Sequence, residues 1–158
     1  MVSTRSGALE KLINGYKFER QKAAAKQCAQ LLHSRVGALP ENTIIVPIPT
    51  AATHIRQRGY DHMRLIAEQL AQRADLPCSL LLARQHSLTQ VGATKQQRQR
   101  QAHSAFSAVR SLDSSKTYLL IDDVVTTGAT LTAGIVALRA AGARKIIVAA
   151  LARQTLDE

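Results

Sequence analysis

The stretch TYLLIDDVVTTGAT, residues 117–130 of this 158-residue chain, decides the fold class. Its first five residues form a short, continuously apolar run of the kind that makes a buried parallel strand. Two adjacent carboxylates, Asp122 and Asp123, follow that run directly, and a predicted helix over 130–141 comes after them. Ligands in open parallel sheets bind beyond the carboxyl ends of the strands. This junction is therefore the first candidate for a binding site.

The side chains of this junction have the chemistry to hold hydroxyl groups, a cation and a phosphate. Two carboxylates at a strand end accept hydrogen bonds from vicinal hydroxyls and help to hold a divalent cation. Residues 126–130 bring three threonines and Gly128 to a helix N-terminus, which suits a phosphate. The strings G-x-x-x-x-G-K-[ST] and G-x-G-x-x-G of other phosphate sites do not occur. Simple helix capping by the threonines, with the carboxylates on a solvated turn, is the structural alternative.

Strands and helices alternate along the rest of the chain, which predicts a parallel sheet covered by helices on both faces. The predicted helices are 8–36, 61–74 and 130–141, and the predicted strands are 43–49, 78–83, 106–109, 117–121 and 145–151. A basic loop follows the strand 43–49. Residues 84–105 hold no acidic side chain and have only a weak apolar face, so they predict a mobile basic loop or flap.

The composition fits one globular domain spanning residues 1–158. No apolar run approaches the length of about 18 residues that spans a membrane. The N-terminus shows no secretory signal and only Cys28 and Cys78 are present, so we expect a cytoplasmic protein with reduced, buried thiols and no zinc. The formal charge of +10 indicates a polyanionic partner: a nucleic acid, a membrane surface or a phosphorylated small molecule. An aromatic content of 3% disfavours a single-strand binder built on stacking platforms.

Several segments together resemble a known family. LLIDDVVTTGATL, residues 119–131, resembles the loop that binds phosphoribosyl pyrophosphate (PRPP) in type I phosphoribosyltransferases. Further segments, spread over residues 9–153, are similar to the ComF family, a group of phosphoribosyltransferase-like proteins linked to natural competence in bacteria. They are VPIP at 46–49, RQRGYD at 56–61, the residues Arg84, Gln90 and Arg98, the pair Ala105-Phe106, and the ending over 142–153.

The resemblance implies an α/β fold of the type I phosphoribosyltransferase kind, with a parallel sheet of about five strands flanked by helices. The basic segment 84–105 takes the place of the family's flexible hood. The implied ligands of the ribose 2- and 3-hydroxyl groups are Asp122 and Asp123, directly or with Mg²⁺, and those of the 5-phosphate are Thr126, Thr127, Gly128, Ala129 and Thr130. The implied pyrophosphate ligands are Pro49, Thr50, Ala51, Arg56, Arg58 and Arg84, and the implied catalytic cations are Lys95 and Arg98.

The implied activity is transfer of a phosphoribosyl group from PRPP, with Mg²⁺ as cofactor, to an acceptor, with release of pyrophosphate. The alternative is a non-catalytic PRPP sensor, or a partner of the DNA-uptake machinery that contacts single-stranded DNA or a competence helicase. A homodimer is a further expectation, and no counterpart of the family's N-terminal zinc module is present.

Three departures from the family pattern bear on these expectations. Asp61-His62 replaces a common Asn-Gln pair, and Gln101 replaces an Asn in the hood. Thr126 stands where 6-oxopurine salvage enzymes carry an aspartate base, which disfavours that reaction. The five histidines show no metal-ligand spacing, so they are predicted to lie at the surface or to pack.

Overall fold

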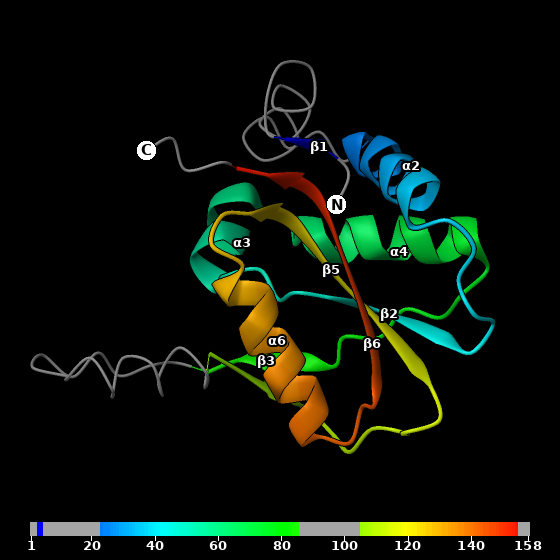
Figure 1. Cartoon of the computed structure of the whole chain (residues 1–158). Helices are drawn as coiled ribbons and strands as arrows, with labels where there is room; N and C mark the ends of the chain where they lie inside the picture. The colour runs from blue at the N-terminus through cyan, green and yellow to red at the C-terminus, as the bar shows by residue number, and fades with distance from the viewer. Residues whose placement is uncertain (1–2, 5–22, 86–104, 155–158) are drawn as a thin grey trace, which may run out of the picture.

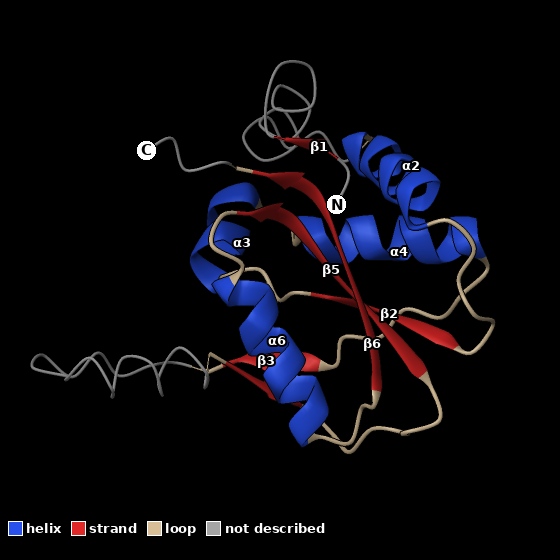
Figure 2. Cartoon of the chain, viewed as in Figure 1, coloured by secondary structure: helices blue, strands red, loops and turns tan. Residues whose placement is uncertain are grey.

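A parallel sheet in the order β1–β6–β5–β2 forms the centre of the protein (Figure 1). The computed structural model describes residues 3–4, 23–85 and 105–154. Helices α2 and α4 cover one face of the sheet and α6 covers the other (Figure 2). The strands of the sheet are β1 (Ser3–Thr4), β2 (Thr43–Pro47), β5 (Thr117–Val125) and β6 (Lys145–Arg153). The helices are α2 (Ala24–Val36), α3 (Ala52–Arg58), α4 (His62–Ala74) and α6 (Ala129–Ala140).

Alternation along β5 gives the sheet two separate apolar cores, because successive side chains of a strand point to opposite faces. Leu119 and Ile121 face α2 and α4 and have no exposed surface. Tyr118 and Leu120 face α6, where they pack in one cluster with Leu138. Both faces are covered, so β5 is apolar at every position from 118 to 121, as a buried parallel strand requires.

Helix α6 lies close against the sheet because Gly134 has no side chain. A Cβ atom at this position would come within 2.9 Å of Ile48 Cδ1 and 3.0 Å of Leu120 Cδ2. The helix begins after Gly128, whose φ of 79° is a left-handed conformation that glycine adopts without strain. This packing places the loop before α6 at the carboxyl end of β5.

Strand β5 is longer than predicted. The sequence predicted a strand that ends at residue 121, with the two aspartates beyond it. Instead, pairing with β6 continues to Val124 opposite Ala152 and Val125 opposite Arg153. Asp122 and Asp123 therefore lie within the strand. The apolar run alone underestimates the strand because the next two residues, Asp122 and Asp123, are charged although they are buried.

The predicted strand 78–83 is confirmed only at Leu82 and Ala83, and not as a strand of the parallel sheet. Cys78 forms only one isolated bridge with Ile45, and the following strand is β3 (Leu82–Arg84), antiparallel to β4 (Phe106–Ala108). The parallel sheet thus has four strands in the part of the chain that the structure describes. Leu82 is buried in the core on the α6 face, which draws this segment away from the sheet edge. Of the predicted flap 84–105, residues 86–104 lie outside the described ranges.

The predicted helix 61–74 is confirmed as α4, and its N-cap is Asp61, whose Oδ1 accepts a hydrogen bond from the Arg64 backbone N–H at 3.2 Å. Part of the predicted helix 8–36 is confirmed as α2, while residues 8–22 lie outside the described ranges. The predicted basic loop after β2 was wrong, because it contains α3. That helix buries no residue, so it lacks the apolar periodicity that reveals a helix in a sequence. None of the described helices has the length and apolar character of a membrane span.

The two cysteines differ in burial. Cys28 is 1% exposed on the inner face of α2, as predicted, whereas Cys78 is only half-buried. Partial burial, reinforced by the negative charge of Glu68, raises the pKa of the Cys78 thiol to about 11. This thiol is therefore protonated and weakly nucleophilic at neutral pH.

Candidate functional site

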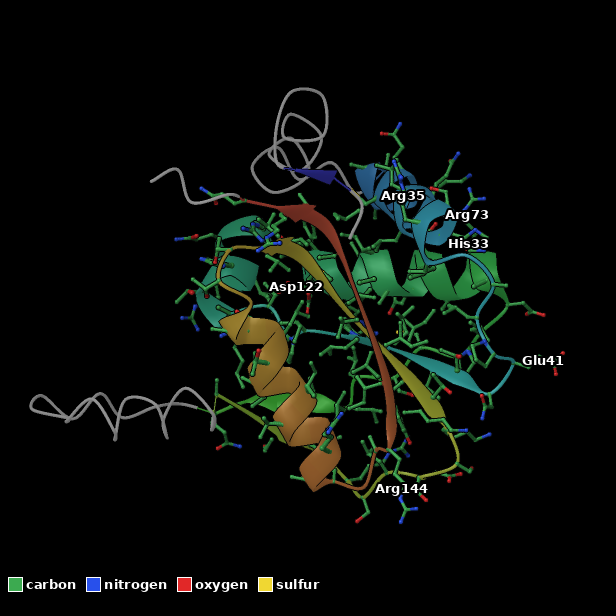
Figure 3. All side chains as sticks on the ribbon, viewed as in Figure 1. His33, Arg35, Glu41, Arg73, Asp122 and Arg144 are labelled. Carbon is green, nitrogen blue, oxygen red and sulfur yellow. The ribbon has the colours of Figure 1, made fainter. Side chains whose placement is uncertain are left out.

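A cavity of about 210 Å³ opens at the carboxyl ends of β2 and β5. Figure 3 shows Asp122 at this end of the sheet, close to α3 and to the start of α6. We call residues 122–130 the β5 side of the site, and residues 49–61 together with Arg84 the β2 side. The predicted site residues that line this cavity are Pro49, Thr50, Ala51, Arg58, Arg84, Asp122, Asp123 and Thr130.

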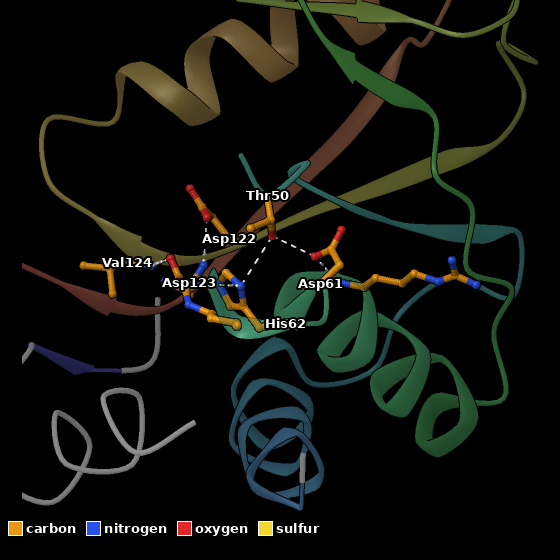
Figure 4. Close-up of polar contacts among 8 residues, drawn as sticks. Thr50, Asp61, His62, Asp122, Asp123 and Val124 are labelled. Atoms are coloured by element: carbon orange, nitrogen blue, oxygen red, sulfur yellow. Dashed lines mark hydrogen bonds and ion pairs between the residues drawn. The ribbon is translucent and has the colours of Figure 1, made fainter. Parts of the chain in front are cut away.

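The two carboxylates of the β5 side are held by the backbone. Asp122 and Asp123 are only 8% and 9% exposed. Asp122 Oδ1 accepts a hydrogen bond from the backbone N–H of Asp123 at 2.9 Å, and Asp123 Oδ1 accepts one from Val124 at 2.7 Å (Figure 4). Hydrogen bonds from N–H groups to an ionised carboxylate are stronger than those between neutral groups, so they fix both side chains at the cavity edge.

The loop that follows encloses a second, smaller cavity that adjoins the first. Thr126, Gly128 and Thr130 line this smaller cavity together with Asp122. The Thr127 hydroxyl instead accepts a hydrogen bond from the backbone N–H of Ala129 at 3.3 Å. Thr127 thus bonds to the first N–H of α6 from the position before the N-cap, which is Gly128. The carboxylates do not lie on a solvated turn, contrary to the helix-capping interpretation.

The β2 side is cross-linked by side chains from distant segments. The Thr50 hydroxyl donates to Asp61 Oδ1 at 2.7 Å, which ties the loop after β2 to the start of α4. Arg84 Nε donates to the Pro49 carbonyl oxygen at 2.8 Å, and its guanidinium lies over the Phe106 ring, 5.1 Å from the ring centroid. Arg84 therefore connects the β3–β4 hairpin to this loop while it lines the cavity.

His62 is the site residue that sequence reasoning missed. It was predicted to lie at the surface or to pack, but the structure places it at the cavity, 5% exposed, with Nε2 2.8 Å from Asp123 Oδ2 (Figure 4). Its Nδ1 is 2.8 Å from Arg58 Nη1. His54 of α3 also lines the cavity. The only signal in the sequence was that His62 stands in RQRGYDH, because its partner Asp123 is 61 positions away.

Among the described residues, three predicted ligands line neither cavity: Arg56, Thr127 and Ala129. Arg56 is exposed on α3 and is not among the residues that line either cavity. Lys95 and Arg98 lie within residues 86–104, outside the described ranges. Within those ranges no group of three or more His, Cys, Asp or Glu side chains is arranged to hold a metal ion.

Comparison with known families decides the membership of the chain. A model of the phosphoribosyl transferase domain matches residues 17–157. The chain belongs to this phosphoribosyltransferase family. It is also 33% identical to Competence protein F of Haemophilus influenzae, in a match that covers 90% of this chain and 66% of that protein. The chain thus spans slightly less than two thirds of that relative, and the family resemblance stated above is confirmed.

Solved phosphoribosyltransferase structures share the fold. Glutamine PRPP amidotransferase from B. subtilis matches with a TM-score of 0.59 and 20% identity, over 82% of this chain and 26% of that chain. Adenine phosphoribosyl transferase from Trypanosoma brucei matches with a TM-score of 0.52 and 20% identity, over 84% of this chain and 53% of that chain. At this identity the likeness confirms the predicted α/β phosphoribosyltransferase-type fold and nothing more.

Proposed function

We propose that this protein binds PRPP in the cavity between its β5 side and its β2 side, and that it transfers the phosphoribosyl group to an acceptor with release of pyrophosphate. The convergence of two carboxylates and two arginines on one cavity carries the proposal. Asp122 and Asp123 come from β5, whereas Arg58 and Arg84 come from α3 and β3. Carboxylates accept hydrogen bonds from sugar hydroxyls, and guanidinium groups bind phosphate oxygens.

The two sides divide the ligand between them. On the β5 side, Asp122 and Asp123 accept hydrogen bonds from the ribose hydroxyls, and the 5-phosphate lies in the adjoining loop 126–130 at the N-terminus of α6. The dipole of this helix and its backbone N–H groups favour an anion there. On the β2 side, Arg58 and Arg84 neutralise the pyrophosphate against the loop 49–51.

The donor set of the β5 side fits Mg²⁺. Protein-bound Mg²⁺ takes oxygen ligands and usually combines one or two carboxylates with substrate phosphates. Asp122 and Asp123 would supply those carboxylate oxygens, and PRPP would supply the phosphates. Bound in this way, Mg²⁺ would offset the negative charge of the departing pyrophosphate.

The protein's own contribution to transfer is to hold the donor and stabilise the leaving group. Displacement at the anomeric carbon leaves the electron pair of the broken C–O bond on pyrophosphate, so cations on the β2 side lower the barrier. Carboxylates that hold both ribose hydroxyls fix the geometry of the reacting carbon. Lys95 and Arg98 of the segment 84–105 are proposed to add positive charge over the pyrophosphate.

Ligand-induced stabilisation tests the proposal. PRPP at about 100 times its dissociation constant should raise the free energy of unfolding by about 2.7 kcal/mol. We expect this shift in the wild type with Mg²⁺ and its loss when Asp122→Ala and Asp123→Ala are combined. Circular dichroism of the unliganded variant checks that the fold is intact. A wild type that PRPP does not stabilise, with or without Mg²⁺, would contradict the proposal.

A second candidate function is a role in natural competence through contact with single-stranded DNA. The likeness to Competence protein F favours it. So do exposed basic side chains at the corner formed by α2 and α4, where Lys26 and Arg73 share a depression and Arg35 lies nearby (Figure 3). The depression shares no lining residue with the cavity proposed to bind PRPP, so the two activities can coexist.

The salt dependence of DNA binding tests this second candidate. Each phosphate contact to single-stranded DNA contributes about 0.7 to the slope of log K against log salt concentration. Lys26→Gln combined with Arg73→Gln should make the slope shallower by about 1.4, the sum of two such contacts. Arg144→Gln, which removes an exposed charge at the other end of the sheet, is the matched control. Affinity that does not change with salt concentration would exclude a phosphate-backbone contact.

A further inference from the structure

His62 joins the two sides of the cavity through one imidazole ring. It is the first residue of α4 and is 5% exposed. Its Nε2 lies 2.8 Å from Asp123 Oδ2 on the β5 side, and its Nδ1 lies 2.8 Å from Arg58 Nη1 on the β2 side. The ring therefore contacts one residue proposed to bind ribose and one proposed to bind pyrophosphate.

The partners of the ring determine where its proton lies. A guanidinium group is always protonated and has no acceptor, so Arg58 donates and His62 Nδ1 accepts. The imidazole proton must then be on Nε2, which donates to the Asp123 carboxylate. Thr50 Oγ1 is 3.4 Å from Nδ1, but its hydroxyl donates to Asp61 at 2.7 Å. One tautomer therefore satisfies every one of these contacts.

The backbone next to His62 is fixed by two hydrogen bonds to the side chain of the preceding residue, Asp61. Asp61 caps α4 by accepting from the Arg64 backbone N–H, and the same carboxylate oxygen accepts from Thr50. By contrast, Arg58 belongs to a seven-residue helix that buries no residue. The position of the Arg58 guanidinium thus depends on its contact with the ring of His62 more than on the packing of its own helix.

We propose that His62 is a positioning residue that sets the ribose half and the pyrophosphate half of the PRPP site at a fixed relative placement. This inference rests on the proposed function. His62 orients the Asp123 carboxylate toward the sugar and holds Arg58 beside the cavity, without itself touching the ligand. Gln at this position could perform the same role, because its amide has both an acceptor for Arg58 and a donor for Asp123. Leu, of similar size, has neither.

Calorimetric titration with PRPP and with its two halves, ribose 5-phosphate and pyrophosphate, tests the proposal in the presence of Mg²⁺. His62→Leu should weaken PRPP binding about tenfold or more. It should also weaken the binding of both ribose 5-phosphate and pyrophosphate, because it removes a hydrogen bond on each side of the cavity. His62→Gln should stay within about threefold of the wild type, since its amide restores both hydrogen bonds. His33→Leu, a half-buried histidine on α2, is the matched control and should bind as the wild type does. Thermal unfolding of each unliganded variant identifies a loss of fold.

The outcomes separate this inference from the proposed function. A wild type that does not bind PRPP contradicts the proposed function. The nitrogen chemical shifts of the His62 ring in the unliganded protein then still test whether the ring bonds to both Asp123 and Arg58. We expect protonated Nε2 and unprotonated Nδ1, and a proton on Nδ1 would overturn the inference. If the wild type binds PRPP, three results would overturn the inference. His62→Leu could bind PRPP as tightly as the wild type, or it could lose affinity for only one of ribose 5-phosphate and pyrophosphate. The third is a folded His62→Gln variant that binds PRPP as weakly as His62→Leu.

Discussion

The β5 side of the cavity is one continuous run of chain, whereas the β2 side is assembled from a loop, helix α3, the N-cap of α4 and a hairpin. Within the β5 side, hydrogen bonds join sequence neighbours, as from the Asp123 N–H to Asp122 and from the Val124 N–H to Asp123. On the β2 side, the contacts join residues far apart: Thr50 to Asp61 across 11 positions, and Arg84 to Pro49 across 35. Local geometry thus shapes the first side, and tertiary packing shapes the second.

This difference predicts that substitutions on the two sides will weaken the binding of different halves of PRPP: ribose 5-phosphate on the β5 side and pyrophosphate on the β2 side. Asp122→Asn should have the largest effect, about a thirtyfold loss of affinity for ribose 5-phosphate, equal to about 2 kcal/mol for hydrogen bonds to a charged group. Pyrophosphate affinity measured without Mg²⁺ should change little, because Asp122 would then reach pyrophosphate through no metal ion. Calorimetric titration of each fragment measures both. Asp75→Asn, an exposed acidic residue at the end of α4, is the control. An equal loss of affinity for both fragments would show that the two sides do not bind separate halves of PRPP.

Arg84→Met should weaken the binding of the other fragment, pyrophosphate. It keeps an apolar stem against Phe106 but removes the charge and the hydrogen bond to the Pro49 carbonyl. We expect about a tenfold loss of pyrophosphate affinity, equal to about 1.4 kcal/mol, with ribose 5-phosphate unaffected. The same fragment titrations measure it, and Arg35→Met on α2 serves as the control. Arg84→Lys separates charge from geometry: full recovery of affinity would show that the contact to Pro49 is unimportant.

Gly128→Ala tests the backbone of the β5 side. A Cβ at Gly128 meets nothing within 4 Å, so its cost comes from the φ of 79° alone and should be about 1 kcal/mol in the free energy of unfolding. Urea unfolding measures this value. Gly37, also with open surroundings, is the control for binding, and its φ of 65° with a ψ of −152° is a combination that glycine alone readily adopts. Gly37→Ala should therefore destabilise at least as much as Gly128→Ala, but only Gly128→Ala should weaken the binding of ribose 5-phosphate. The idea fails if Gly37→Ala weakens it too.

Asp61→Ala tests the backbone of the β2 side and should have the smallest effect. Loss of the exposed N-cap of α4 should lower the free energy of unfolding by about 0.5–1 kcal/mol. Pyrophosphate affinity should fall modestly, because Thr50 loses its acceptor. Asp61→Asn keeps an oxygen acceptor and should retain most of both properties in urea unfolding and titration. An Asn variant as impaired as the Ala variant would show that charge, rather than capping, matters here.

The elements with regular apolar patterns were predictable from sequence, and the others were not. The buried strand from 117, the helix 61–74 and the strand from 145 were all visible, because burial on one or two faces imposes a periodicity. Helix α3 could not be predicted because none of its residues is buried, so its sequence shows no apolar periodicity. The segment 78–83 was apolar enough to suggest a strand of the sheet, but Leu81 and Leu82 are buried in the core beneath α6, whereas Cys78 packs against the opposite core. Apolar patterns show that a segment is buried without showing which partner buries it.

The sequence by itself determined the β5 side: two carboxylates, a loop of threonine and glycine, and the start of a helix, all within residues 117–130. Its resemblance to the family also placed Thr50, Arg56, Arg58 and Arg84 among the candidate pyrophosphate ligands. Only the tertiary structure decided which of these reach the cavity, leaving Arg56 outside it, and added His62 as the link between the two sides. Spacing along a strand and a loop fixes the geometry of neighbours, but a contact across 61 positions exists only once the sheet and α4 have packed.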